Sequence, residues 1–110
     1  MSNEINTALL DAVIDDQETR VCWLLEHGAD PNFFEDIARI TPLHFAAHHN
    51  ALNVVPLLVM AGAKLSSLTD EGETPVAVAK RHGYHEMVRL LSRFSTMPTL
   101  SASVSAFFEA

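Results

Sequence analysis

Residues 41–47, Thr-Pro-Leu-His-Phe-Ala-Ala, decide the fold of this chain. The threonine hydroxyl can cap a helix N-terminus, and proline suits the first helical position, where no N–H is needed. Leu43, Ala46 and Ala47 then fall on one face, whose small alanines let a neighbouring helix approach closely. The stretch predicts a short helix that packs tightly against another.

The same pattern occurs three times. Residues 74–79 repeat it 33 positions later (74 − 41), and residues 7–12 repeat it more weakly 34 positions earlier (41 − 7). Each threonine is followed two positions on by Leu or Val, five on by Ala and fourteen on by Val, and the first two copies close with Gly-Ala at 28–29 and 62–63. Each copy therefore predicts a helix, a tight turn, a bulkier second helix and a loop.

The turns between the paired helices carry Asp16, Asn50 and Gly83, each nine residues after its threonine. These residue types tolerate the positive φ that such a turn needs. Pro56 falls near the first turn of its helix, where it is tolerated. We expect helices at 4–14, 18–27, 42–49, 53–61, 75–82 and 86–94.

Motif, period and Leu-Leu…Gly-Ala endings resemble the ankyrin repeat, whose signature is T-P-L-H-x-A. The resemblance implies an all-α fold, an α-solenoid of three stacked helix-turn-helix repeats with finger loops. It covers a domain at 1–94, with repeats at about 3–35, 36–68 and 69–94. It also implies that His44 hydrogen-bonds a loop to the neighbouring repeat. The linker 33–40 departs from the family because it lacks the usual Asp-Gly hairpin.

The C-terminal residues 95–110 are rich in serine and threonine, so we expect disorder with one or two weak helical turns from Thr99 onward. Phe107 and Phe108 either cover the end of the third repeat or form a recognition tail. The composition also resembles the export signals of effector proteins that some intracellular bacteria inject into host cells. Delivery into a host cell is therefore an alternative to the cytoplasmic location expected below.

Composition limits the class of partner. Of the fourteen acidic residues, nine lie in residues 1–36 against Arg20 alone, and the net charge is −7. An acidic surface repels phosphates, so we expect no nucleic acid partner. The longest apolar run, 54–61, is too short to cross a bilayer, and the N-terminus lacks signal-peptide features. With Cys22 as the single cysteine, the sequence predicts a cytoplasmic protein without a membrane partner.

Catalytic and metal chemistry find no support in the sequence. His44 and His48 have the i, i+4 spacing of metal ligands, but no third ligand is fixed by spacing, so we expect no metal or other cofactor. Cys22 stands four residues from both Glu18 and Glu26, which raise the pKa of its thiol and oppose thiolate formation. Known catalytic motifs are absent, and Asp15-Asp16 fits a cap and turn. We expect a protein that is not an enzyme.

The expected binding surface is the concave face formed by the fingers and the inner helices, which the ankyrin family uses for protein partners. The predicted partner-binding residues on this face are Phe33, Phe34, Ile37, Arg39 and Ile40 in the first finger, Leu68, Asp70 and Glu71 in the second, and His48, His49, Arg81 and His82 on the inner helices. Ile14, Asp15 and Glu73 belong to the same face. Four of the predicted residues are large apolar side chains in the first finger, and aromatic residues often anchor interfaces. We expect some of the four to be buried and at least one to be presented.

The predicted function is a non-catalytic, monomeric protein-protein interaction module. Its histidines would make binding sensitive to pH near neutrality. The alternative is a structural protein that self-associates through the first finger and Phe107-Phe108.

Overall fold

The computed structural model describes residues 2–34 and 37–96. This part of the chain forms six helices: α1 (Ser2–Ile14), α2 (Glu18–Glu26), α3 (Pro42–His49), α4 (Val55–Met60), α5 (Pro75–His82) and α6 (His85–Thr96). They match the six predicted helices. Helix α6 continues to Thr96, two residues beyond the helix end expected at residue 94. The predictions for Phe107, Phe108 and the rest of 97–110 lie outside the described residues.

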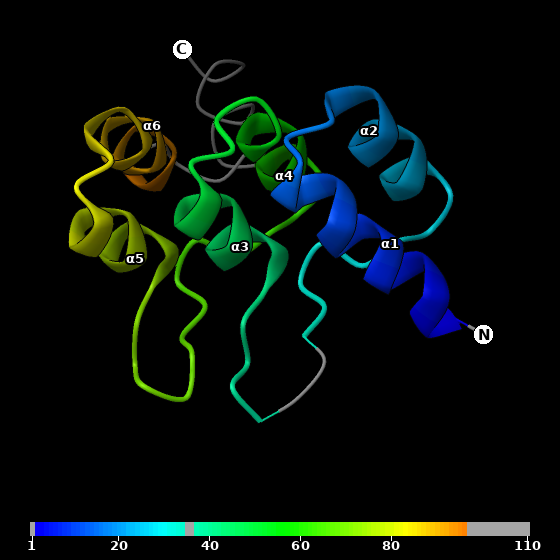
Figure 1. Cartoon of the computed structure of the whole chain (residues 1–110), viewed down its shortest axis with the longest axis horizontal. Helices are drawn as coiled ribbons and strands as arrows, with labels where there is room; N and C mark the ends of the chain where they lie inside the picture. The colour runs from blue at the N-terminus through cyan, green and yellow to red at the C-terminus, as the bar shows by residue number, and fades with distance from the viewer. Residues whose placement is uncertain (1, 35–36, 97–110) are drawn as a thin grey trace, which may run out of the picture.

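The helices form two rows (Figure 1). Inner helices α1, α3 and α5 lie side by side, and α2, α4 and α6 form the second row behind them. The two long loops before α3 and α5 project from the same side of the stack. We call residues 33–40 the first finger and residues 66–73 the second finger. The expected solenoid of three helical pairs is confirmed.

Local sequence explains where the inner helices begin and end. The Thr74 hydroxyl accepts a hydrogen bond from the Ala77 N–H at 3.2 Å, and proline follows each capping threonine of α3 and α5. The turn residues Asp16, Asn50 and Gly83 have φ of 54°, 55° and 74°, as predicted. Residues at equal positions therefore set the C-terminal turns of all three inner helices and the N-termini of α3 and α5. Helix α1 differs, because it begins at Ser2, five residues before Thr7.

Helix α4 begins at Val55, two residues later than predicted, because Asp16 of the first repeat occupies the preceding turn. Its carboxylate accepts hydrogen bonds from the N–H groups of Asn53 and Val54 at 3.1 and 3.2 Å and from the Asn53 amide at 2.9 Å. The interpretation of Asp16 as a turn residue was correct but incomplete. Its side chain also ties the first repeat to the second.

The core runs between the two rows and is built from the repeated apolar positions. Leu9 and Leu43 are fully buried, as are Val21 and Val55 from the outer helices. Large buried side chains of this kind each contribute about 1.5–3 kcal/mol. The helices of the repeats supply the core, and the two fingers extend from it. The fingers are therefore available for binding.

Candidate functional site

The second finger is closed by its own hydrogen bonds. The Thr69 N–H donates to the Glu73 carbonyl at 3.0 Å, and the Gly72 N–H donates to the Thr69 carbonyl at 2.9 Å. The Thr69 hydroxyl accepts from the N–H groups of Glu71 and Glu73 at 3.3 and 3.2 Å. With Gly72 at φ 78°, these bonds form a compact turn.

His44 holds the base of the second finger. The Thr41 N–H donates to His44 Nδ1 at 3.2 Å, so the ring proton sits on Nε2, which donates to the Glu73 carbonyl at 2.9 Å. Burial lowers the pKa of His44, opposed in part by the Glu73 carbonyl, so the ring is neutral at pH 7. The implied bond from His44 to the loop of the next repeat is confirmed. Both ring nitrogens are used, which leaves neither for a metal.

The first finger lacks this support. Leu10 occupies in the first repeat the position that His44 has in the second, three residues after the threonine, and it is buried. An aliphatic side chain cannot bind the finger's carbonyls. Arg39 has a left-handed φ of 58°, and the Ala38 carbonyl accepts from the Asp70 N–H of the second finger at 3.0 Å. The first finger is thus braced by the second.

Apolar side chains project from the first finger. Ile37 is 88% exposed, Phe34 is 48% exposed and Ile40 is 37% exposed, while Phe33 is half-buried. The expectation that at least one would be presented is confirmed. The expectation that some would be buried is met only in part, because Phe33 is half-buried and none of the four is fully buried.

A groove runs between α3, α5 and the bases of both fingers. It measures about 190 Å³, and its wall is mainly Ile40, Phe45 and Val78, with His44, His48, His49, Thr69, Glu73 and Arg81 completing it. The structure therefore brings together Ile40, His48, His49 and Arg81 from the predicted site. Phe45 and Val78 were missed, although both stand four residues after a threonine, one helical turn along the inner face.

Rings line the inner helices beyond the groove. His48 lies 4.8 Å from His49 and 4.5 Å from His82 between ring centroids, and His82 stacks on Tyr84 at 5.4 Å. The pKa of His49 is lowered by partial burial and by His48, while Asp15 at the end of α1 acts in the opposite sense. At pH 7 the lowered pKa favours the neutral form of His49.

The remaining predicted residues lie around the groove rather than in it. Leu68 and the acidic pair Asp70 and Glu71 are exposed on the second finger, Arg39 is exposed on the first, and His82 is half-buried under its ring neighbours. Arg81 at the groove wall forms a bidentate ion pair with Glu73, at 2.9 and 3.1 Å.

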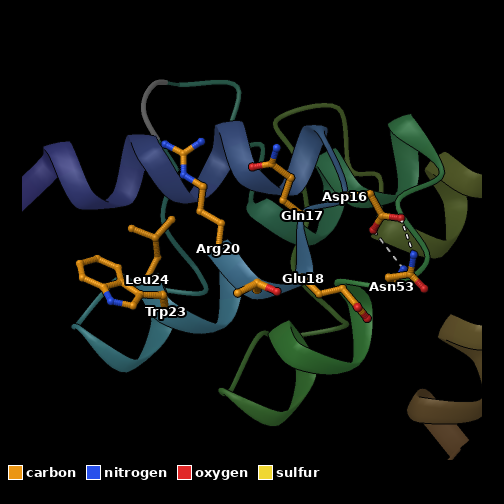
Figure 2. Close-up of a pocket in the computed structure, with 8 residues that line it drawn as sticks. Asp16, Gln17, Glu18, Arg20, Trp23, Leu24 and Asn53 are labelled. Carbon is orange, nitrogen blue, oxygen red and sulfur yellow. Dashed lines mark hydrogen bonds between the residues drawn. The ribbon is translucent and has the colours of Figure 1, made fainter.

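A second hollow lies on the outer row (Figure 2). It is wider, about 740 Å³, and is lined by Asp16, Gln17, Glu18, Thr19, Arg20, Trp23, Leu24 and Asn53. Trp23 lies at one end and the hydrogen-bonded pair Asp16–Asn53 at the other. Trp23 is 54% exposed and stacks on His27 with 3.8 Å between ring centroids. The hydrogen bonds between Asp16 and Asn53 in this hollow hold the first two repeats together, so these two side chains already have partners.

Cys22 lies on the same outer helix, and its thiol lies 3.7 Å from the Glu26 carboxylate. The negative charge of Glu26 raises the pKa of the thiol. This agrees with the predicted effect of Glu26 and disfavours the reactive thiolate at pH 7.

A family profile described as "Ankyrin repeats (3 copies)" matches residues 9–99. The chain belongs to the ankyrin-repeat family. Repeats of this family stack into curved solenoids whose extended concave surfaces bind partners.

Several ankyrin-repeat relatives are similar over most of the chain. The human ARF GTPase-activating protein GIT1 is 40% identical over 68 residues, 62% of this chain and 9% of that protein. Cyclin-dependent kinase inhibitor 2A of Monodelphis domestica is 37% identical over 68 residues, 62% of this chain and 40% of that protein. Mouse ankyrin repeat domain-containing protein 37 is 33% identical over 81 residues, 74% of this chain and 50% of that protein. The chain thus spans at most half the length of these relatives.

Among the helices of the described residues, none is long and apolar enough to cross a membrane.

Proposed function

We propose that this ankyrin-repeat chain is a non-catalytic module that binds a protein partner through its concave face. The contact surface comprises the first finger, the groove and the exposed ends of α3 and α5. The observation that carries the proposal is the exposure of Ile37, Phe34 and Ile40 on a loop that makes no use of them for its own fold. Exposed apolar side chains gathered on a loop mark interaction sites.

Three further observations support a binding role rather than a catalytic one. The polar side chains with buried atoms at the groove, His44 and Thr41, are committed to each other and to the backbone. Cys22 has a raised pKa, the reverse of what a nucleophile needs. The name of the relative cyclin-dependent kinase inhibitor 2A likewise describes action on another protein.

Affinity capture from a cell lysate tests the proposal, with the wild-type chain and the variant Phe34→Ser/Ile37→Ser/His48→Ser/His49→Ser as baits. Because these side chains are exposed, the variant keeps the wild-type circular dichroism melt and loses the captured protein. A matched control, Trp23→Ser/Met60→Ser, removes exposed apolar side chains from the outer helices and retains capture. Equal capture by all three baits would place the interface elsewhere.

Self-association is a second candidate function, favoured by the same exposed apolar finger. In that case two chains would bury Phe34 and Ile37 against each other. Light scattering across a range of protein concentrations separates the two candidates, since a mass that stays at one chain removes the second. We propose the monomeric form, located in the cytoplasm.

A further inference from the structure

The groove between α3 and α5 has the size of a side-chain pocket. Its volume of about 190 Å³ lies below the roughly 300–1,000 Å³ typical of small-molecule sites. By the volume that water occupies in the liquid, it holds about six molecules. A space of this size accommodates one large side chain rather than a cofactor or metabolite.

Apolar side chains form part of the wall of the groove. Ile40 comes from the first finger, Phe45 from α3 and Val78 from α5, so three separate elements converge on it. Its polar wall atoms are largely committed: His44 bonds Thr41 and Glu73, and Glu73 pairs with Arg81. An entering group therefore finds hydrocarbon contacts and few polar atoms that need a partner, which favours an apolar side chain.

The surface around the groove is acidic. Asp70 and Glu71 are exposed on the second finger, Asp11 is exposed on α1, and Asp15 is exposed just after the end of α1. Asp11 stands four residues after Thr7, the position that Phe45 and Val78 occupy in their repeats, so it extends the same inner face. None of these four carboxylates forms an ion pair with another described residue. Arg39 provides an opposite charge on the first finger, and Arg81 is neutralised by Glu73.

We propose that the partner presents a large apolar side chain, Leu, Ile, Met or an aromatic residue, with Lys or Arg within a few positions of it. The apolar group enters the groove between Ile40, Phe45 and Val78, and the cations face Asp70 and Glu71 on one side and Asp11 and Asp15 on the other. This inference rests on the proposed function, because it describes the partner of the same face. Acidic segments are repelled by the rim.

Selection from a phage-displayed library of random 12-residue peptides tests the chemistry without a known partner. The full chain is immobilised, and enriched peptides are synthesised and measured by fluorescence anisotropy. We expect the enriched peptides to share one large apolar residue with Lys or Arg nearby. Enrichment of acidic or uncharged peptides, or no enrichment at all, would overturn the inference.

Matched variants locate the peptides on the molecule. Asp70→Lys/Glu71→Lys reverses two rim charges, and Glu18→Lys/Glu26→Lys makes the same change in net charge on the outer helix α2. Exposed ion pairs contribute up to about 1 kcal/mol each, so the rim variant raises Kd roughly tenfold, whereas the control stays within about twofold. Equal effects of the two variants would show only a dependence on net charge and would contradict the inference.

The groove itself is tested with Ile40→Ser, and with His48→Ser should the first variant lower the melting temperature. Each variant is expected to lower the affinity for the peptide by tenfold or more, a loss of the kind seen when a contact at the centre of an interface is removed. If selected peptides are acidic or uncharged yet lose affinity on Ile40→Ser, the partner chemistry is wrong and the proposed function stands. If peptides that combine a basic and an apolar residue bind these variants with unchanged affinity but lose affinity on Trp23→Ser, the proposed face is wrong.

Discussion

The two fingers occupy the same place in consecutive repeats and are built in opposite ways. The second finger closes on itself through Thr69 and is anchored by His44. The first finger has Leu10 where that anchor would stand, and it exposes Phe34 and Ile37. The polar groups of the second finger form hydrogen bonds within that finger, whereas the first finger exposes large apolar side chains that are available for contact.

This difference teaches that a single position in one repeat decides the character of the loop that follows it. Histidine at the third residue after the threonine can reach the base of the next finger, whereas leucine only fills the core. The second finger then supports the first through the bond from Asp70 N–H to the Ala38 carbonyl, 3.0 Å long. The second finger thus helps to position the first.

The largest expected effect breaks the anchor of the second finger. His44→Leu copies the first repeat's residue and leaves the Thr41 N–H and the Glu73 carbonyl without their partner. A buried polar group left unpaired costs about 1–3 kcal/mol, so we expect a loss of roughly 2 kcal/mol in unfolding free energy. Urea denaturation followed by circular dichroism measures it. His48→Leu, at an exposed position of the same helix, stays within about 0.5 kcal/mol.

A smaller loss is expected from Gly72→Ala in the turn of the second finger. The space around Gly72 is open, with no atom within 4 Å of an added Cβ, so the cost is conformational. At φ 78° an L-residue costs about 1–2 kcal/mol. Ser66→Ala, in the exposed start of the same finger, is the matched control. Unchanged urea midpoints for Gly72→Ala would show that the turn is not held in this conformation.

In the first finger, a glycine substitution is expected to raise the free energy of unfolding rather than lower it. Arg39→Gly relieves a left-handed residue at φ 58°, and the gain exceeds the greater entropy of glycine in the unfolded chain. We expect a stabilisation of about 0.5 kcal/mol, measured in the same denaturation series. A destabilised variant would mean that the Arg39 side chain makes a contact worth more than the strain.

The pH dependence of stability gives a similarly small effect. Burial lowers the pKa of His44 below its usual 6.5, so on acidification the unfolded chain takes up the proton first. Stability is therefore full above about pH 7.5 and falls as the pH passes below 6.5 towards the folded-state pKa. One histidine accounts for less than about 1 kcal/mol between pH 7 and 6. His44→Leu should flatten this slope, with the remainder due in part to His49, whose pKa is also lowered.

The sequence predicted the structural features that recur from one repeat to the next. The capping threonines and the turn residues with positive φ follow from aligned positions, whereas the bond of His44 to the next loop was implied by the resemblance to the ankyrin signature. It also located Ile40, His48, His49 and Arg81 on what proved to be one groove. These features depend on register, and register is visible in a single chain.

What the sequence did not predict depends on contacts between repeats. Asp16 reaches Asn53 across 37 positions, and the Asp70 N–H bonds the Ala38 carbonyl, and neither pairing has a local signal. Phe45 and Val78 were not among the predicted binding residues, although both line the groove. Only the stacked helices show that one side of each remains open to the groove.

The most direct test of the central claim compares affinities of one captured partner. Isothermal titration calorimetry would use the wild type, the first-finger variant Phe34→Ser/Ile37→Ser and the outer-face variant Trp23→Ser/Met60→Ser, each with its melting temperature. We predict that the first-finger variant loses at least roughly tenfold in affinity at an unchanged melting temperature, while the outer-face variant binds as the wild type does. Full affinity in the first-finger variant, with loss in the outer-face variant, would contradict the account.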